Sequence, residues 1–306
     1  MSLLAALAAT APGTPIEPDP LSPWGTPYVS TVDLAAGASI LTALTAMNTA
    51  NASAADPDLA RKLRLAPGTY ASEKVSTAAA YVSIVGTGDT PADTYWTWPN
   101  GPSDPERQYP LNVSRTLHLV NLTIEGEHYS YAVHADGNAG GAGFPTQLIC
   151  EGVHFKNATG QQAIGIGSGG RQEMYFKDCT FEVSGGNGAP FFGHNSATQS
   201  YPSLVVLDNC TILSENEGIA WTDVNSDQPD LFIVSGGSMV APGTDVVLSL
   251  GALVPTATDS TIDYRIDSAF TVGGGDAASV SRVIPDPLPH WTDSTSLHNV
   301  HFGIHA

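Results

Sequence analysis

Positive charge is scarce in this sequence. Only 11 of the 306 residues are lysine or arginine, against 30 aspartate and glutamate residues, so the formal net charge at pH 7 is −19. A surface with this balance repels phosphate backbones and anionic lipid headgroups. We therefore expect neither nucleic acid nor a membrane surface as a partner.

Cysteine and long apolar runs are also in short supply. The three cysteines, Cys150, Cys179 and Cys210, lack the paired spacing of a zinc site and the even number of a disulfide framework, so buried thiols are expected. No run reaches the roughly 18 apolar residues of a membrane span. The opening MSLLAALAATAPG lacks the basic start of a secretory signal, so no secretion signal is expected. We expect no metal and no cofactor. Acidic residues with His134 are the alternative metal ligands, but their spacing is not diagnostic of a metal site, and no nucleotide fingerprint is present.

Proline is concentrated near the N-terminus, where residues 11–28 contain six prolines. This density favours extended chain over helix or sheet. We assign residues 1–30 to a Pro-rich N-terminal arm, which is either a disordered tail or a segment that becomes ordered along a partner.

An amphipathic helix is predicted over residues 31–50. Thr31 or Asp33 can cap its first turn, and the stretch LAPGTYA (residues 65–71) follows it with a Pro-Gly turn. Beyond that turn the helical period gives way to short alternating runs, so we expect the helix to cap the open end of a β-structure. Its apolar stripe comprises Leu34, Ile40, Leu41, Leu44 and Met47.

A short motif recurs through the central part of the chain as VNLTIEG, EGVHFKN, KDCTFEV, DNCTILS and SGGSMVA. Its apolar positions are Ile124, Phe155, Phe181, Ile212 and Met239, which lie 31, 26, 31 and 27 residues apart. This repeat is rich in glycine, threonine and β-branched residues and has no helical stripe, so it predicts a solenoid of stacked β-coils in which these residues form one interior column.

Two further sets of side chains are expected to stack in this solenoid. Asn121, Asp178 and Asn209 share the turn position, where short polar side chains bond to local backbone and to one another. Cys179 and Cys210 share the position directly after it, immediately before Thr180 and Thr211, which indicates interior stacking and not redox chemistry.

The order of amphipathic helix, DLARKLRL, PGTY and IVGTG (residues 84–88) resembles the entry to proteins of the pectin lyase-like superfamily. The resemblance extends over roughly residues 31–98 by motif and 117–251 by repeat pattern. It implies an all-β fold, a right-handed parallel β-helix with an N-terminal capping helix over residues 31–275, followed by a C-terminal extension over residues 276–306. The superfamily includes pectate lyases, pectin esterases, polygalacturonases and phage tailspike and tail-associated proteins, and the fold alone does not choose among them.

A catalytic site is not identified, because no residues match the catalytic sets of the lyases or esterases. Asp136 and Asp223 are predicted three coils apart, about 14 Å, which exceeds the carboxylate spacing of glycoside hydrolases. His134 and Asp136 have no nucleophile nearby. The sequence therefore favours a protein without enzymatic activity, with a polysaccharide lyase or glycoside hydrolase as the alternative.

A saccharide groove is predicted along one face formed by the strands that follow each repeat motif. Aromatic rings beside imidazoles, amides and carboxylates suit a sugar, which needs an apolar platform surrounded by hydrogen-bonding groups. The alternative is that Phe192 and Trp221 belong to the core and the polar residues fill turns. The candidates are His134, Asp136, Phe192, His194, Asn195, Trp221, Asp223 and Asn225.

The resemblance, together with the unsignalled N-terminus and the scarcity of lysine, favours a phage virion protein of the tail or surface that contacts host cell-surface polysaccharide. The arm would bind other virion proteins, and a final strand in HNVHFGIHA would provide the contacts of a homotrimer on the particle surface. The alternatives are a polysaccharide-degrading lyase or hydrolase and a purely structural capsid or tail decoration protein.

Overall fold

The structure is a computed structural model, and it describes residues 21–51, 60–71, 75–77, 81–97, 111–113, 116–126, 131–136, 146–157, 162–168, 172–184, 190–195, 204–214, 219–221, 230–240, 248–250, 262–266 and 271–273. Within these residues the regular structure is β-strand in three sheets, with one α-helix, α1 (Ile40–Asn51), and a short 3-10 helix, η3 (Pro91–Asp93). Neighbouring strands within each sheet run parallel, as in β1 with β2 and β3 with β6. The expected all-β fold class is confirmed at this level.

Each strand belongs to one of the three sheets. The nine-stranded sheet contains, in spatial order, β1 (Ser30–Leu34), β2 (Arg61–Leu65), β5 (Val82–Gly86), β8 (Leu117–Val120), β11 (Thr146–Glu151), β14 (Gln172–Lys177), β17 (Leu204–Asp208), β20 (Asp230–Ser235) and β23 (Ile262–Ile266). The eight-stranded sheet contains β3 (Gly68–Ala71), β6 (Thr94–Thr97), β9 (Thr123–Glu125), β12 (His154–Asn157), β15 (Thr180–Val183), β18 (Thr211–Ser214), β21 (Ser238–Val240) and β24 (Thr271–Gly273). The seven-stranded sheet contains β4 (Val75–Thr77), β7 (Leu111–Val113), β10 (Tyr131–Asp136), β13 (Gln162–Ser168), β16 (Phe191–Asn195), β19 (Ile219–Trp221) and β22 (Leu248–Leu250).

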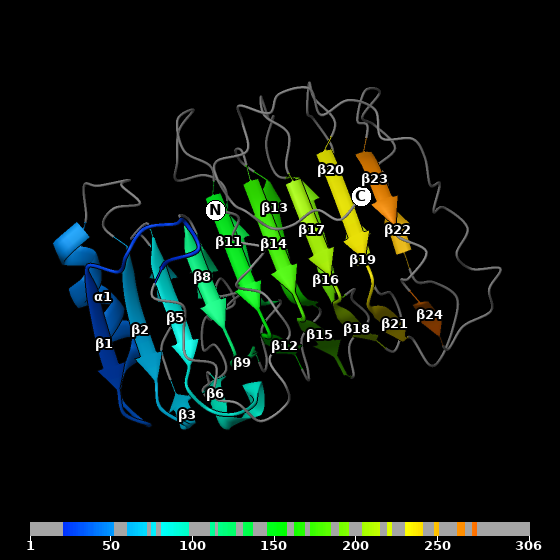
Figure 1. The fold of residues 1–306 in the computed structure, drawn as a ribbon. Coiled ribbons are helices and arrows are strands. Elements are labelled where there is room, and N and C mark those ends of the chain that lie inside the picture. The colour runs from blue at the N-terminus through cyan, green and yellow to red at the C-terminus, as the bar shows by residue number, and fades with distance from the viewer. Residues whose placement is uncertain are drawn as a thin grey trace.

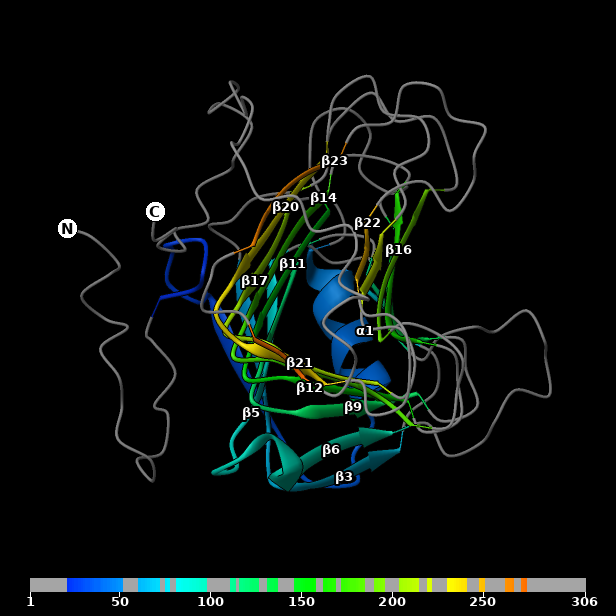
Figure 2. The ribbon, with the colours of Figure 1, turned by 90° about the vertical axis from the view of Figure 1, so that its right-hand side faces the viewer.

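The chain visits the three sheets in a fixed order. From β2 it passes to β3 and β4, returns to the nine-stranded sheet at β5, and repeats this circuit as far as β20, β21 and β22. Figure 1 shows the strands of successive circuits side by side, and Figure 2 shows the three sheets edge-on around a common interior. Each circuit therefore adds one strand to every sheet.

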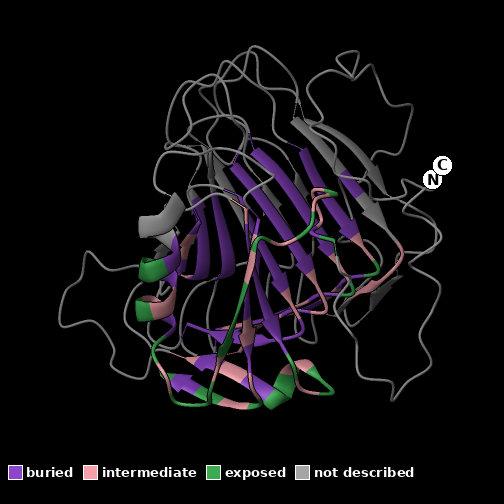
Figure 3. Cartoon of the chain, turned by 60° about the vertical axis from the view of Figure 1, so that its left-hand side comes forward, coloured by how far each residue is buried: buried purple, intermediate pink, exposed green. Residues whose placement is uncertain are grey.

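The interior of the eight-stranded sheet confirms the predicted apolar column. Ile124, Phe155, Phe181 and Ile212 pair in register across four strands, and all are fully buried. The rings of Phe155 and Phe181 stack with centroids 5.2 Å apart and planes only 8° from parallel. Figure 3 shows that burial extends over most of the described strands. With its outer members, the column comprises Tyr70, Trp96, Ile124, Phe155, Phe181, Ile212, Met239 and Val272.

The three cysteines are free and buried, as the sequence predicts. Cys150 lies in an interior position of the nine-stranded sheet, and Cys179 and Cys210 lie just before β15 and β18. Burial raises the pKa of the Cys150 and Cys210 thiols well above its ordinary value. These thiols therefore act as apolar packing groups.

The corner between the nine- and eight-stranded sheets contains the predicted polar turn position. Asn121, Asp178 and Asn209 have positive φ angles of 50°, 52° and 51°, and Gly152 and Gly236 occupy equivalent places at 59° and 62°. Asn209 Nδ2 donates to Asp178 Oδ1 at 2.5 Å, which confirms the ladder for this pair. Asparagine and glycine tolerate this left-handed conformation best, which explains why these residues recur at the corner.

Replacing Gly152 by asparagine should raise the free energy of unfolding by about 0.5–1 kcal/mol, because asparagine accepts the φ angle and restricts the unfolded chain. A Cβ atom at this position meets nothing within 4 Å. Urea denaturation measures the change. The control is Gly152→Val, whose β-branched side chain disfavours positive φ and should destabilise the protein. Asparagine that destabilises as valine does would contradict this account of the corner.

Helix α1 begins later than the sequence predicts. Residues 30–34 form β1, which pairs with β2 at the edge of the nine-stranded sheet, so the predicted helix over residues 31–50 is wrong in its first turns. The cap is Ser39, whose Oγ accepts from the Thr42 backbone N–H at 3.1 Å, and not Thr31 or Asp33. Parallel pairing with β2 suits the β-branched Thr31 and Val32 better than a helix does.

The buried side of α1 packs against the first circuits, as expected of a covering helix. Ile40, Leu44 and Met47 are buried in the same apolar cluster as the interior of the sheets. Figure 2 shows α1 inside the outline of the three sheets. The buried Tyr70 of the Pro-Gly turn donates its hydroxyl to the Leu34 and Ala66 carbonyls at 2.9 and 2.7 Å, which links β1 to β3.

Candidate functional site

The predicted groove residues occupy several register columns of the seven-stranded sheet. His134 and Phe192 share one column, and Asp136 and His194 share the next column but one. Trp221 lies in the column between them, since it pairs with Gly193. Successive columns of a sheet belong to opposite faces. The register therefore separates Trp221 from His134 and Asp136, which is a correction to the predicted single face.

The column of Trp221 is otherwise an interior column. Its members Ala135 and Ile166 are fully buried in the apolar cluster. Asn195 pairs with Ser168, so it lies in the column that follows that of His194. Asp223 and Asn225 lie outside the described residues.

The side chain of Tyr131 supplies the clearest local feature of this sheet, and the sequence analysis did not identify it. A Cβ atom built on Gly165 would come within 2.3 Å of the Tyr131 ring, so this ring occupies the space above Gly165. The rings of Tyr131 and His134 lie 5.2 Å apart with planes 35° from parallel. Tyr131 is half-buried and His134 is buried. The signal in the sequence was the glycine paired with His134, which leaves room for a neighbouring ring.

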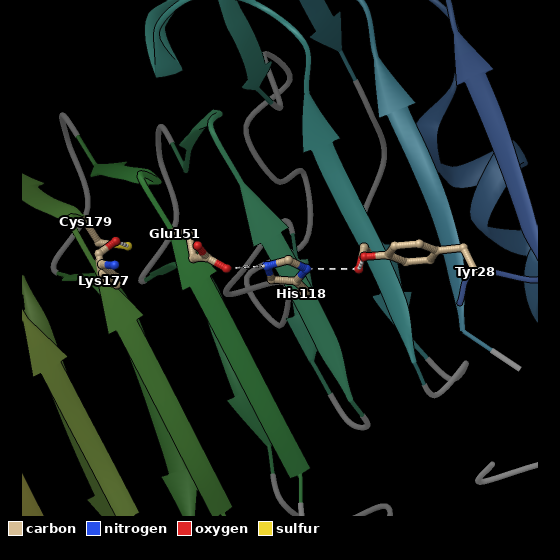
Figure 4. Close-up of polar contacts among 6 residues, drawn as sticks. Tyr28, His118, Glu151, Lys177 and Cys179 are labelled. Atoms are coloured by element: carbon tan, nitrogen blue, oxygen red, sulfur yellow. Dashed lines mark hydrogen bonds and ion pairs between the residues drawn. The ribbon is translucent and has the colours of Figure 1, made fainter. Parts of the chain in front are cut away.

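A second polar cluster lies on the outward face of the nine-stranded sheet, under the segment Leu21–Val29. The Tyr28 hydroxyl lies 2.8 Å from Ser83 Oγ, which lies 3.0 Å from His118 Nδ1. The other ring nitrogen of His118 lies 3.1 Å from Glu151 Oε1. Figure 4 shows Tyr28, His118 and Glu151 in line across neighbouring strands. We call this set the Tyr28–Glu151 chain.

The segment Leu21–Val29 is held on the sheet by ring contacts as well. Trp24 packs edge-on against Tyr81, with ring centroids 5.0 Å apart, and lies near His118. The Lys62 ammonium lies 4.0 Å from the centre of the Tyr28 ring. Part of the predicted arm therefore packs on the chain's own sheet, and residues 1–20 lie outside the described residues.

The Tyr28–Glu151 chain ends at a carboxylate, which accepts the Nε2 proton of His118. The Ser83 hydroxyl joins His118 Nδ1 to the Tyr28 hydroxyl by two further hydrogen bonds. Burial acts to raise the pKa of Glu151, but the hydrogen bond from His118 and the charges of His118 and Lys177 outweigh it, so this pKa lies below its ordinary value. The chain therefore favours ionised Glu151.

A serine, a histidine and a carboxylate in contact resemble a hydrolytic triad. Here, however, the serine is buried and the carboxylate is exposed, which is the opposite of what such a triad requires. Ser83 is fully buried beneath Tyr28, whereas the Glu151 side chain is 38% exposed. A nucleophilic serine must face the substrate. The arrangement accordingly supports fastening of Leu21–Val29 to the sheet and not acyl transfer.

Replacing Tyr28 by phenylalanine should lower the free energy of unfolding by about 1 kcal/mol, because it removes one hydrogen bond and keeps the ring that packs on Lys62. Chemical denaturation of Tyr28→Phe, Ser83→Ala and the double variant measures the coupling. A coupling energy of about 0.5 kcal/mol or more is expected. Strict additivity of the two single changes would show that the hydroxyls do not interact.

The eight-stranded sheet has a row of alternating charges. Glu125, Lys156 and Glu182 pair in register, and His154 Nε2 lies 2.8 Å from Glu182. Burial lowers the pKa of His154, and the neighbouring Glu182 opposes this effect without reversing it. Lys156 stands between the two glutamates, where an inverting hydrolase would place water. This row therefore resembles a stabilising surface network more than a carboxylate pair for catalysis.

Within the part of the chain that the structure describes, no group of three or more histidine, cysteine, aspartate or glutamate side chains is placed to hold a metal ion. None of the helices described there is long and apolar enough to cross a membrane.

Comparison with known proteins gives little further guidance. No protein-family model and no curated protein matches the chain. The crystal structure of Escherichia coli YbhC is similar, with a TM-score of 0.46 and 16% sequence identity, over 91% of this chain and 81% of that chain.

Proposed function

We propose that this protein binds polysaccharide on the face of the seven-stranded sheet that carries His134 and Gly165. The observation that carries the proposal is the half-buried Tyr131 ring lying over Gly165 beside His134. A flat ring with hydrogen-bonding neighbours is the kind of surface on which a sugar ring packs. Because strands pair in register along the whole sheet, this face offers a chain-like ligand an extended row of positions.

We further propose that the three sheets form a right-handed parallel β-helix of the pectin lyase-like type. The fixed order of the circuits and the continuous register of the columns support this assignment. Crossovers between parallel strands of one sheet are right-handed in about 98% of cases, which supports the hand.

The biological setting that we propose is a phage virion, in which the protein forms a homotrimer and contacts host polysaccharide. The support is the sequence resemblance, and residues 1–20 would attach the protein to other virion proteins. Deletion of residues 1–20 should abolish attachment to particles while the fold is kept. The deletion stops there because Trp24 and Tyr28 hold the following segment on the sheet. Normal attachment of the shortened chain would contradict this role.

Glycan binding by Tyr131→Ala tests the proposed site. We expect at least about a tenfold loss of affinity, since about 1.4 kcal/mol of ring stacking corresponds to a factor of ten. The matched control is Tyr95→Ala, which removes a half-buried tyrosine from the eight-stranded sheet and should leave the affinity unchanged. If both substitutions lowered the glycan affinity equally, or if neither changed it, the assignment of the binding site to Tyr131 would be wrong. Release of reducing ends from a bound glycan would favour the hydrolase alternative.

A further inference from the structure

We infer that the polysaccharide bound on this face is composed of uncharged sugars; this inference rests on the proposed function and narrows its ligand. The relevant surface is the column of residues that pair in register with His134, which we call the His134 column. Its members, in spatial order, are Ser76, Asn112, His134, Gly165, Phe192, Ala220 and Ser249.

The His134 column contains no lysine, arginine, aspartate or glutamate. It runs through all seven strands of the sheet, and its residue types are serine, asparagine, histidine, glycine, phenylalanine and alanine. Hydroxyl groups of neutral sugars bond to hydroxyl, amide and imidazole groups without the desolvation cost of a buried ion. Tyr131 adds a ring beside the middle of the column.

The basic residues of the described strands all lie on the other two sheets. Arg61, Lys62, Arg64, Lys177 and Arg265 belong to the nine-stranded sheet, and Lys156 belongs to the eight-stranded sheet. The strands of the seven-stranded sheet contain no lysine or arginine, and their single acid is Asp136. Recognition of uronates or sulfates relies on lysine and especially arginine. This sheet lacks both.

The net charge of the whole chain also disfavours binding of acidic polysaccharides. A net charge of −19 repels a polyanion, and the repulsion extends over about 10 Å at moderate ionic strength. Asp136 lies two residues from His134 and adds a local negative charge to the strand. A neutral glycan is not subject to this repulsion, so the face selects against acidic polysaccharides by charge as well as by the groups that it offers.

The experiment compares neutral polysaccharides, such as glucans, galactans and mannans, with polygalacturonate and a sulfated glycan, using immobilised full-length protein. Titrations are run from about 20 to about 500 mM NaCl, because screening weakens ionic binding. They are repeated with calcium, since a divalent cation bridges carboxylates of like charge. We expect at least one neutral glycan to bind with an affinity that changes less than about twofold over this range.

Variants separate this inference from the proposed function. Tyr131→Phe should keep neutral-glycan affinity and Tyr131→Ala should lose it, with thermal unfolding measured to show that both variants fold. Arg115→Ala is the control for a basic residue that follows β7 closely in the sequence, and it should have no effect. Salt-sensitive or calcium-dependent binding of polygalacturonate without neutral binding would overturn the inference and leave polysaccharide binding intact. Absence of binding to either group of glycans would overturn both.

Discussion

Replacing Phe181 by alanine should lower the free energy of unfolding by about 3–5 kcal/mol. Phe181 is fully buried and stacks on Phe155, and it also packs edge-on against Phe176 and Phe191, with ring centroids 5.2 Å away in each case. These neighbours come from all three sheets, so removal of the ring leaves a cavity at the point where the sheets meet. Close-packed interiors relax only partly around such a cavity.

Urea denaturation of Phe181→Ala measures this loss, and an unchanged slope against urea would show that the unfolding transition itself is the same. The control is Thr180→Ala on the same strand, because Thr180 is only half-buried and lies in the adjacent, outward column. A change within about 0.5 kcal/mol is expected there. If Phe181→Ala cost no more than Thr180→Ala, the aromatic cluster would not be the centre of the core.

Replacing Gly237 by alanine should destabilise the protein by more than about 3 kcal/mol, whereas the same change at the adjacent Gly236 should cost only about 1 kcal/mol. Both residues have positive φ angles, 62° for Gly236 and 81° for Gly237, so both pay the left-handed penalty of an L-residue. They differ in the space available. A Cβ atom on Gly237 would lie 2.1 Å from the Cys210 carbonyl oxygen, and one on Gly236 would have its nearest neighbour at 3.8 Å.

The comparison isolates the steric contact, because the two glycines are neighbours at one corner. The obstructing atom belongs to the backbone of the preceding circuit and cannot rotate away as a side chain does. Thermal unfolding of the two variants, with circular dichroism to check the β-content, would measure the difference. Equal destabilisation at both positions would mean that adjacent circuits are not packed this closely at the corner.

The sequence predicts the interior of this protein well because the same circuit is repeated. Ile124, Phe155, Phe181 and Ile212 recur at nearly constant spacing, and parallel strands in register convert that spacing into direct contact. The polar corner could be predicted for the same reason. The period of the repeat and the residue types at each position were sufficient to predict both features, without knowledge of contacts between distant parts of the chain.

The start of the fold could not be predicted in this way. Thr31 and Asp33 follow a pattern that is compatible with a helix, and only pairing with β2, some thirty residues away, makes this segment a strand. The Tyr28–Glu151 chain escaped notice for a similar reason. Its contacts join residues that lie 55, 35 and 33 positions apart in the sequence. The segment Leu21–Val29, which covers it, is not part of the repeat.

The candidate site was predicted in part. The strands that carry His134 and His194 lie in one sheet, as predicted, but Trp221 lies in a register column of the opposite face. An error of one residue moves a side chain to the other face of a sheet. Loops between the strands differ in length from circuit to circuit, so the repeat motif alone does not determine the register on the seven-stranded sheet.

The equivalence of the circuits has a consequence for the evolution of this chain. Cys179–Thr180 and Cys210–Thr211 occupy matching places one layer apart, and Thr180 pairs directly with Thr211. Excision or duplication of the 31 residues between these points would join like backbone to like backbone. The molecule can therefore lengthen or shorten by whole layers, and related genes would be expected to vary in steps of one layer while their ends stay the same.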